Sequence, residues 1–260
     1  MESVTMSEKW YQISPIELVR WAEPLVFDEG EAEGFPEELI ASYEAAAEVR
    51  LPAAFRDYLL ACGQADLNSS LHEMFIPDRN AEPFQHRLTF SYDYIKGDLK
   101  WFREKEEQDY EELARLRALP QQRWSEITDN YLLFWCENQG CWYAGIKVED
   151  LSRPDPVVYF NDKDDMYHWV PFADSVQSFL LSTILENMEE ELHVDEIRNP
   201  TQIQKHLAEG DVDFQRLQEP YPFSGGRFVH TCLDRDANTL YVYGEQTKER
   251  LAYLKIIQVE

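Results

Sequence analysis

One carboxylate in the sequence stands where acid–base chemistry could occur. Glu137 directly follows the apolar run of residues 131–136, and burial beside such a run would raise its pKa into a range useful for proton transfer. Catalysis at this position would also need a histidine or a second carboxylate within reach, and the sequence offers none at a fixed spacing from Glu137. We therefore predict that the chain is not an enzyme, with acid–base chemistry at Glu137 as the minor alternative.

Residues 161–165, with the sequence NDKDD, carry the oxygen ligands of a calcium-binding loop. Such a loop places ligands at alternate positions and glycine at the sixth, but Lys163 or Met166 occupies a ligand position in either register. The six histidines show no metal-ligand spacing, and the sequence contains no P-loop, dinucleotide-binding, nucleophile-elbow or zinc-protease motif. We predict no metal site, no cofactor and no catalytic residue.

The four cysteines form no CxxC motif, and three of them lie in apolar runs where a thiol behaves as a small hydrophobic group. Cys136 and Cys141 flank an expected hairpin and could approach each other across it, although core packing is the favoured interpretation. The first residues lack a signal-peptide pattern, and no window has the 18 uncharged apolar residues of a membrane span. We expect a soluble, cytoplasmic protein with reduced thiols and no membrane contact.

Acidic residues dominate the charge, with 50 Asp and Glu against 24 Lys and Arg and a net charge of -26. The resulting negative field opposes binding to nucleic acid and anionic lipid and favours a basic protein partner. Two acidic segments are candidate contact surfaces, although a solvated surface is the simpler interpretation of both. The candidate partner-binding residues are Glu104, Glu107, Glu111, Asp162, Asp164 and Asp165.

Helix signals are clear in the first quarter of the chain. Ser14 is a candidate N-cap, with Pro15 at the first helical position and Glu17 placed to complete a capping box. A second helix is expected over residues 36–48, ended by the Leu-Pro step before residue 53. A third helix follows from residue 53 and ends at Gly63, a candidate left-handed C-cap.

The middle of the chain predicts a sheet of short strands. Residues 131–136 suit a buried strand, Gly140 supplies a positive φ for a turn, and residues 141–146 return as the partner strand. Further strands are expected at 74–77, 88–92 and 156–160, a helix in the second half of 101–120, and a helix from 174 to 188 with Asp174 as its N-cap. Strands at such short spacing form a meander, so we predict an α+β fold with a central, mainly antiparallel sheet flanked by helices.

The last seventy residues predict a mixture of helix and strand. A helix capped by Asn199, with Pro200 in its first turn and Gly210 after its end, precedes two strands around 225–233 and 239–245. Residues 247–258 are predicted to form a final helix, with a strand from Leu254 as the alternative. These strands would extend the central sheet, and a separate C-terminal domain is the other possibility.

Several segments occur in a characteristic order: a helix with LPAAFRDYLLACG, an apolar strand ending in ENQG, a returning WYAGI strand, a DPVVYF strand and a DSVQSFLLSTIL helix. The matching positions are Leu51, Pro52, Glu137, Asn138, Gln139, Gly140, Trp142, Tyr143, Gly145, Ile146, Asp155, Pro156, Val157 and Tyr159. This pattern resembles the SUKH superfamily, which includes the fungal Smi/Knr-like regulator of cell-wall synthesis and many bacterial proteins.

The resemblance implies a single SUKH-like domain over residues 1–260, with its core at about 36–188 and an extension at 189–260 that completes it. The family-motif residues would then be structural. Bacterial members of the superfamily act mainly as immunity proteins, so the resemblance implies a cytosolic protein that neutralises a basic, nuclease-type toxin by stoichiometric occlusion. The alternative is a cytoplasmic regulatory scaffold that binds endogenous proteins, as in the fungal relatives.

Overall fold

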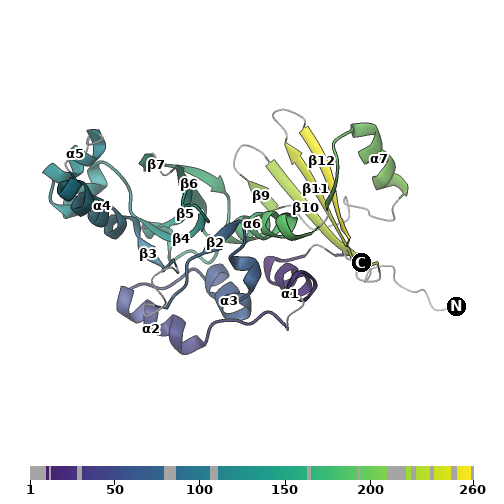
Figure 1. Cartoon of the computed structure of the whole chain (residues 1–260), viewed down its shortest axis with the longest axis horizontal. Coiled ribbons are helices and arrows are strands. Elements are labelled where there is room, and N and C mark those ends of the chain that lie inside the picture. Colours follow the sequence, from purple (N-terminus) through teal and green to yellow (C-terminus); the bar gives the residue numbers. More distant parts are fainter. Residues whose placement is uncertain are drawn as a thin grey trace.

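The computed structural model describes residues 10–11, 13–27, 31–78, 86–105, 111–162, 165–192, 194–209, 221–223, 227–234, 237–246 and 251–258. Its helices and strands are shown in Figure 1. The helices are α1 (Pro15–Val26), α2 (Glu37–Ala47), α3 (Ala53–Cys62), α4 (Ser91–Lys105), α5 (Glu111–Ala118), α6 (Val176–Glu191) and α7 (Pro200–Glu209), with 3-10 helices η1 (Asp66–Asn68), η2 (Gln121–Glu126) and η3 (Val148–Asp150). The strands are β1 (Trp10–Tyr11), β2 (His72–Met74), β3 (Thr89–Phe90), β4 (Tyr131–Glu137), β5 (Trp142–Lys147), β6 (Val158–Asp162), β7 (Asp165–Ala173), β8 (Val194–Ile197), β9 (Tyr221–Phe223), β10 (Arg227–Asp234), β11 (Thr239–Gln246) and β12 (Leu251–Gln258).

The described strands form one sheet in the order β2-β4-β5-β6-β7-β9-β10-β11-β12-β8, with β1 on β10 and β3 on β4. The pairs between named strands are antiparallel, and β4 to β7 follow one another as a meander. The predicted α+β fold with a mainly antiparallel sheet is therefore confirmed. In the described part of the chain, a single residue pair, Ala173 with Phe223, joins β7 to β9. The sheet thus consists of two ladders, β2 to β7 and β8 to β12, visible as two groups of arrows in Figure 1.

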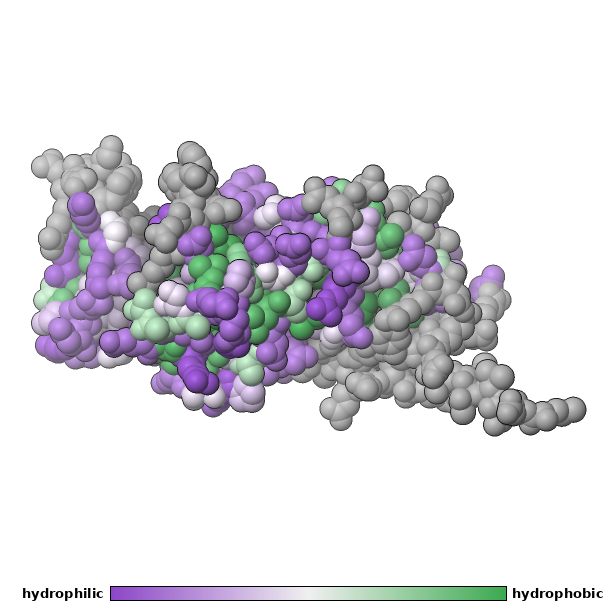
Figure 2. Space-filling view, turned by 90° about the horizontal axis from the view of Figure 1, so that it is seen from below, coloured by the Kyte–Doolittle hydropathy of each residue, from purple (hydrophilic) through white to green (hydrophobic). Residues whose placement is uncertain are grey.

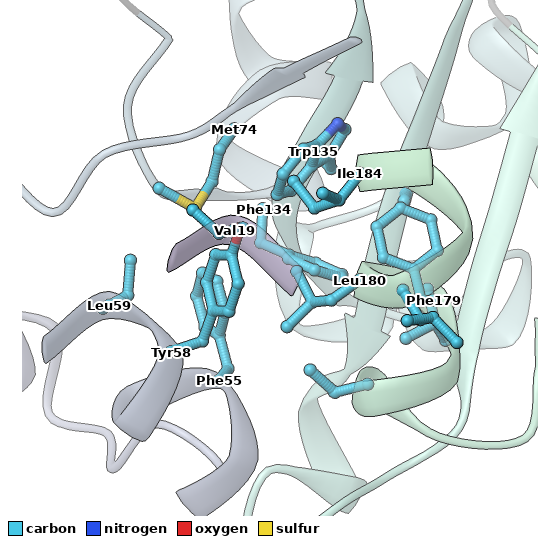
Figure 3. Close-up of a cluster of buried hydrophobic side chains, with 14 of the residues drawn as sticks. Val19, Phe55, Tyr58, Leu59, Met74, Phe134, Trp135, Phe179, Leu180 and Ile184 are labelled. Atoms are coloured by element: carbon cyan, nitrogen blue, oxygen red, sulfur yellow. The ribbon is translucent and has the colours of Figure 1, made fainter. Parts of the chain in front are cut away.

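The main core lies between the sheet and helices α1, α3 and α6, and Figure 3 shows its part against the first ladder. Leu233, Leu240 and Ile257 of the second ladder belong to the same core. Phe134 of β4 contacts Phe55 of α3 and Phe179 of α6, with ring centroids 5.0 Å and 5.2 Å away. Trp135, the next residue, also contacts Phe179, at 5.9 Å. Neighbouring strand residues normally point to opposite faces, but a bulge between Leu133 and Trp135 lets both side chains pack against α6.

The predicted helix caps at two positions are confirmed. Oγ of Ser14 accepts the Glu17 backbone N–H at 3.2 Å, and Oε2 of Glu17 accepts the Ser14 N–H at 3.0 Å, which is a complete capping box. At the start of α7, Oδ1 of Asn199 accepts the N–H groups of Thr201 and Gln202. The proposed glycine after α7, Gly210, lies outside the described residues.

Two predicted caps are wrong. Gly63 is right-handed, with φ of -64°, and a Cβ there would lie 2.5 Å from the Phe35 ring; glycine therefore serves close packing at this position. The left-handed residue ends α2 instead, at Glu48 with φ of 57°. At the start of α6, Ser175 replaces Asp174 as the N-cap, and its Oγ accepts the Ser178 N–H at 3.0 Å.

The predicted final helix is also wrong, because residues 251–258 form strand β12. This strand pairs with β11 over its whole length, from Leu251 opposite Gln246 to Gln258 opposite Thr239. Leu254 and Ile257 are buried. The cross-strand pairing and two-sided burial outweigh the helical spacing of the leucines.

Residues 91–105 and 111–118 form a second helical unit, and the strand expected over 88–92 is shorter than predicted. Strand β3 covers only Thr89–Phe90, and α4 begins at Ser91. Helices α4 and α5 enclose a separate apolar cluster, formed by Ile95, Leu99, Leu113, Leu116 and Trp124. The predicted helix in the second half of 101–120 corresponds to α5.

Burial predicts that two cysteines are chemically inert in the folded protein. Burial raises the pKa of the Cys62 thiol to about 12, although its hydrogen bond with Tyr58 partly offsets this rise. Burial also raises the pKa of Cys136. Since the thiolate is the reactive form, iodoacetamide at about pH 8 should leave both residues unmodified until urea unfolds the chain. Mass spectrometry of tryptic peptides would measure this, and rapid native alkylation of Cys62 would contradict it. Cys62, Cys136 and Cys141 are free thiols.

Candidate protein-interaction site

The hairpin between β4 and β5 is a compact polar projection at the end of the first ladder. Gly140 has φ of +68°, which favours glycine, and its N–H donates to the Glu137 carbonyl oxygen at 2.7 Å. Asn138 and Gln139 are exposed. The predicted turn at this position is confirmed.

The Glu137 carboxylate is held by the hairpin itself. Its Oε2 accepts the backbone N–H groups of Gln139 and Cys141, both at 3.0 Å. Burial acts to raise the pKa of Glu137, but these hydrogen bonds and nearby His72 outweigh it and lower the pKa below its usual value. The raised pKa considered as a basis for acid–base chemistry is therefore wrong. Glu137 is an anion that stabilises a turn.

His72 connects this hairpin to α6. It lies opposite Glu137 on the β2–β4 ladder, and its Nε2 is 2.9 Å from Oε2 of Glu186. Its ring lies against Trp142, with centroids 5.0 Å apart and a tilt of 52°. The backbone N–H of His72 donates to Oδ1 of buried Asn187 at 2.8 Å. Side chains from β2, β4, β5 and α6 thus meet at one place, which we call the hairpin cluster: His72, Glu137, Trp142 and Glu186.

The lowered pKa of Glu137 makes a small pH-dependent contribution to stability. Because the folded-state pKa lies below the unfolded value, the contribution is present above the unfolded pKa and is lost as pH falls through the folded pKa, over roughly pH 5 to 3. The side chain is largely open to solvent, so we expect only a few tenths of a kcal/mol. Urea denaturation of wild type and Glu137→Gln at several pH values should show a stability difference that shrinks with acidification; a difference that grows would contradict the assignment.

The remaining family-motif residues have structural positions. Leu51 and Pro52 are buried directly before α3, and Pro156 is buried before β6. Gly145 lies under aromatic rings: a Cβ there would be 3.0 Å from the Trp169 ring. Trp169 in turn stacks on Tyr131 at 4.1 Å, and Tyr159 contacts Tyr131 at 5.4 Å.

The acidic residues predicted to bind a partner lie around the helical unit and the β6–β7 connection. Glu104 belongs to α4, and Glu111 is the exposed first residue of α5. Asp162 ends β6 and Asp165 begins β7; Glu107 and Asp164 lie outside the described residues. Tyr167, two residues after Asp165, packs against the apolar cluster of α4 and α5. Helix α5 and the start of β7 therefore lie toward the same end of the molecule (Figure 1).

Sequence reasoning did not single out His72 or Glu186. They are 114 residues apart in the chain, and no local spacing relates a histidine on a short strand to a glutamate on a helix. Among the residues that the structure describes, no three His, Cys, Asp or Glu side chains are grouped so as to hold a metal ion. No helix in that same part of the chain is long and apolar enough to cross a membrane.

The family comparison covers strands β2, β4 and β5, which supply His72, Glu137 and Trp142 of this site. The family model described as SMI1 / KNR4 family (SUKH-1) matches residues 34–182, which run from the segment before α2 into α6 and include the β4–β5 hairpin. Comparison with curated proteins and with solved structures gave no match. Because the family model matches more than half of the 260 residues, the chain belongs to the SMI1 / KNR4 (SUKH-1) family.

Proposed function

We propose that the protein is a non-enzymatic immunity protein that binds a basic, nuclease-type bacterial toxin and neutralises it by covering its active surface. The family includes immunity proteins and regulators, and the net charge of -26 favours the first of these with a basic target. In this proposal the protein acts in the cytoplasm, binds neither nucleic acid nor membrane, and uses no cofactor.

The observation that carries the proposal is that basic side chains are engaged in internal ion pairs while acidic side chains are in excess. Arg56 contacts Glu37 and Glu44. Lys147 lies 3.1 Å from Asp129 and 2.7 Å from Glu149, and its pKa is raised by these hydrogen bonds. Lys255 lies 2.5 Å from Glu189. Each of these cations is neutralised inside the protein, so the surplus of carboxylates acts outward.

Such a surface suits a target that itself binds nucleic acid. Complementary charge accelerates encounter and disfavours partners of the wrong sign. Figure 2 looks onto the side where α1, α2 and α3 lie and shows hydrophilic residues around a smaller central area of apolar ones. The antiparallel sheet and its aromatic core would hold this surface in a fixed shape, which reduces the entropy lost on binding.

The test is rescue of cells from a toxin encoded beside this protein's gene. Co-expression with that toxin's C-terminal domain should preserve growth and give a 1:1 complex in gel filtration. Cell death without a complex would overturn the proposal for that pair. A neighbourhood without any toxin gene, together with capture of endogenous proteins, would favour the regulatory scaffold instead.

A further inference from the structure

We propose that the hairpin cluster is a receptor for an arginine side chain of the protein partner. The inference rests on the proposed function for the identity of the partner, but the chemistry comes from the cluster alone. Its components are the indole face of Trp142, the carboxylates of Glu137 and Glu186, and the imidazole of His72.

The two carboxylates are fixed in place without a lysine or arginine beside them in the described part of the chain. Glu137 is held by two backbone N–H groups and Glu186 by His72, and the Glu186 side chain is 49% exposed. Within the part of the chain that the structure describes, neither forms an ion pair with a lysine or arginine. Other carboxylates of the protein do form such ion pairs, with Arg56, Lys147 and Lys255. Two carboxylates face one imidazole, so the hairpin cluster keeps a net negative charge in either protonation state of His72 and is a preorganised anionic site.

Trp142 adds an aromatic surface beside these anions. Its side chain is partly exposed, and its ring is supported by His72 at 5.0 Å and by Phe160 at 5.6 Å. Tryptophan has the strongest attraction for cations among aromatic side chains, and arginine is the commonest protein cation found over it. A guanidinium stacked on this ring could also hydrogen-bond to a flanking carboxylate.

His72 supplies an independent indication that the cluster is incomplete. Its side chain is only 7% exposed, and its Nδ1 has no hydrogen-bond partner. Buried polar atoms are normally paired. If Nε2–H donates to Glu186, Nδ1 is an acceptor enclosed by its neighbours, and a donor that enters the cluster as these side chains shift would complete it. Guanidinium has five N–H donors in a plane, so it fits two carboxylates and an imidazole acceptor better than an ammonium group.

The test uses hexa-arginine peptide as the probe and the full-length protein as the receptor. Calorimetric titration in about 150 mM NaCl suppresses long-range attraction. The double variant Glu137→Gln/Glu186→Gln keeps the shape of both side chains and should raise Kd about tenfold or more. The matched control Glu33→Gln/Glu38→Gln removes the same charge from exposed positions and should change Kd by less than about twofold.

Two further measurements locate the site. The indole N–H resonance of Trp142, assigned by its loss in Trp142→Phe, should shift on addition of hexa-arginine, and wild type should bind hexa-lysine more weakly. Equal weakening by the two double variants, or an unmoved Trp142 resonance at saturation, would overturn the receptor. Failure of the wild type to rescue cells or bind the toxin domain would count against the proposed function and leave this peptide result standing.

Discussion

Replacing Phe134 by alanine should lower the free energy of unfolding by about 4 kcal/mol, because the change removes a fully buried ring and leaves a cavity. The ring is 0% exposed and joins three elements, since it contacts Phe55 of α3 and Phe179 of α6 from strand β4 (Figure 3). Urea denaturation followed by circular dichroism would measure the change.

Two control variants separate this effect from general damage. Phe134→Leu retains most of the apolar volume and should cost less than half as much as alanine. Val170→Ala shortens a side chain that is 53% exposed and should change stability by less than about 0.5 kcal/mol. A Phe134→Ala protein as stable as wild type would show that the centre of the core lies elsewhere.

Association with the cognate toxin domain should slow by about 100-fold between about 0.02 M and 0.5 M NaCl, because salt screens the field that steers a basic partner to this acidic protein. The net charge of -26 makes the long-range attraction large. Short-range contacts change less with salt, so the dissociation rate should rise by a much smaller factor. Stopped-flow fluorescence with the chain's tryptophans would give both rates.

A toxin domain from an unrelated, acidic family serves as the control for this prediction. It should show no association that slows with added salt, since salt screens a repulsion between two acidic proteins and not an attraction. A salt-independent association rate with the cognate domain would mean that the acidity of the chain serves solubility and contributes nothing to recognition.

Local sequence signals predicted the elements whose hydrogen bonds are themselves local. The Ser14 capping box, the Asn199 cap and the Gly140 turn each depend on residues within a few positions of one another. The order of the β4, β5 and β6 strands followed from short apolar runs and from turns between them. These features required no knowledge of distant contacts.

The incorrect predictions concern residues whose structure depends on contacts with residues distant in the sequence. Gly63 is constrained by Phe35 from another segment, and β12 is a strand because β11 and β8 lie on its two sides. The hairpin cluster could not be predicted from the sequence for the same reason. His72, Trp142 and Glu186 come from three elements that only the fold brings together. Ser175 and Asp174 are both good N-cap residues, and only the helix geometry selects between them.

The narrow junction between the two ladders has a consequence for amide hydrogen exchange. Among the residues that the structure describes, Ala173 and Phe223 are the one pair across it, whereas β11 and β12 pair over their full lengths. Little cooperativity can pass through one backbone pair, so the coupling between the ladders rests on the side chains of their shared core, including α6, which contacts both β7 and β9. Slowly exchanging amides should therefore fall into two groups, one for each ladder, that are coupled through this core, with those of α6 protected as long as the more stable group.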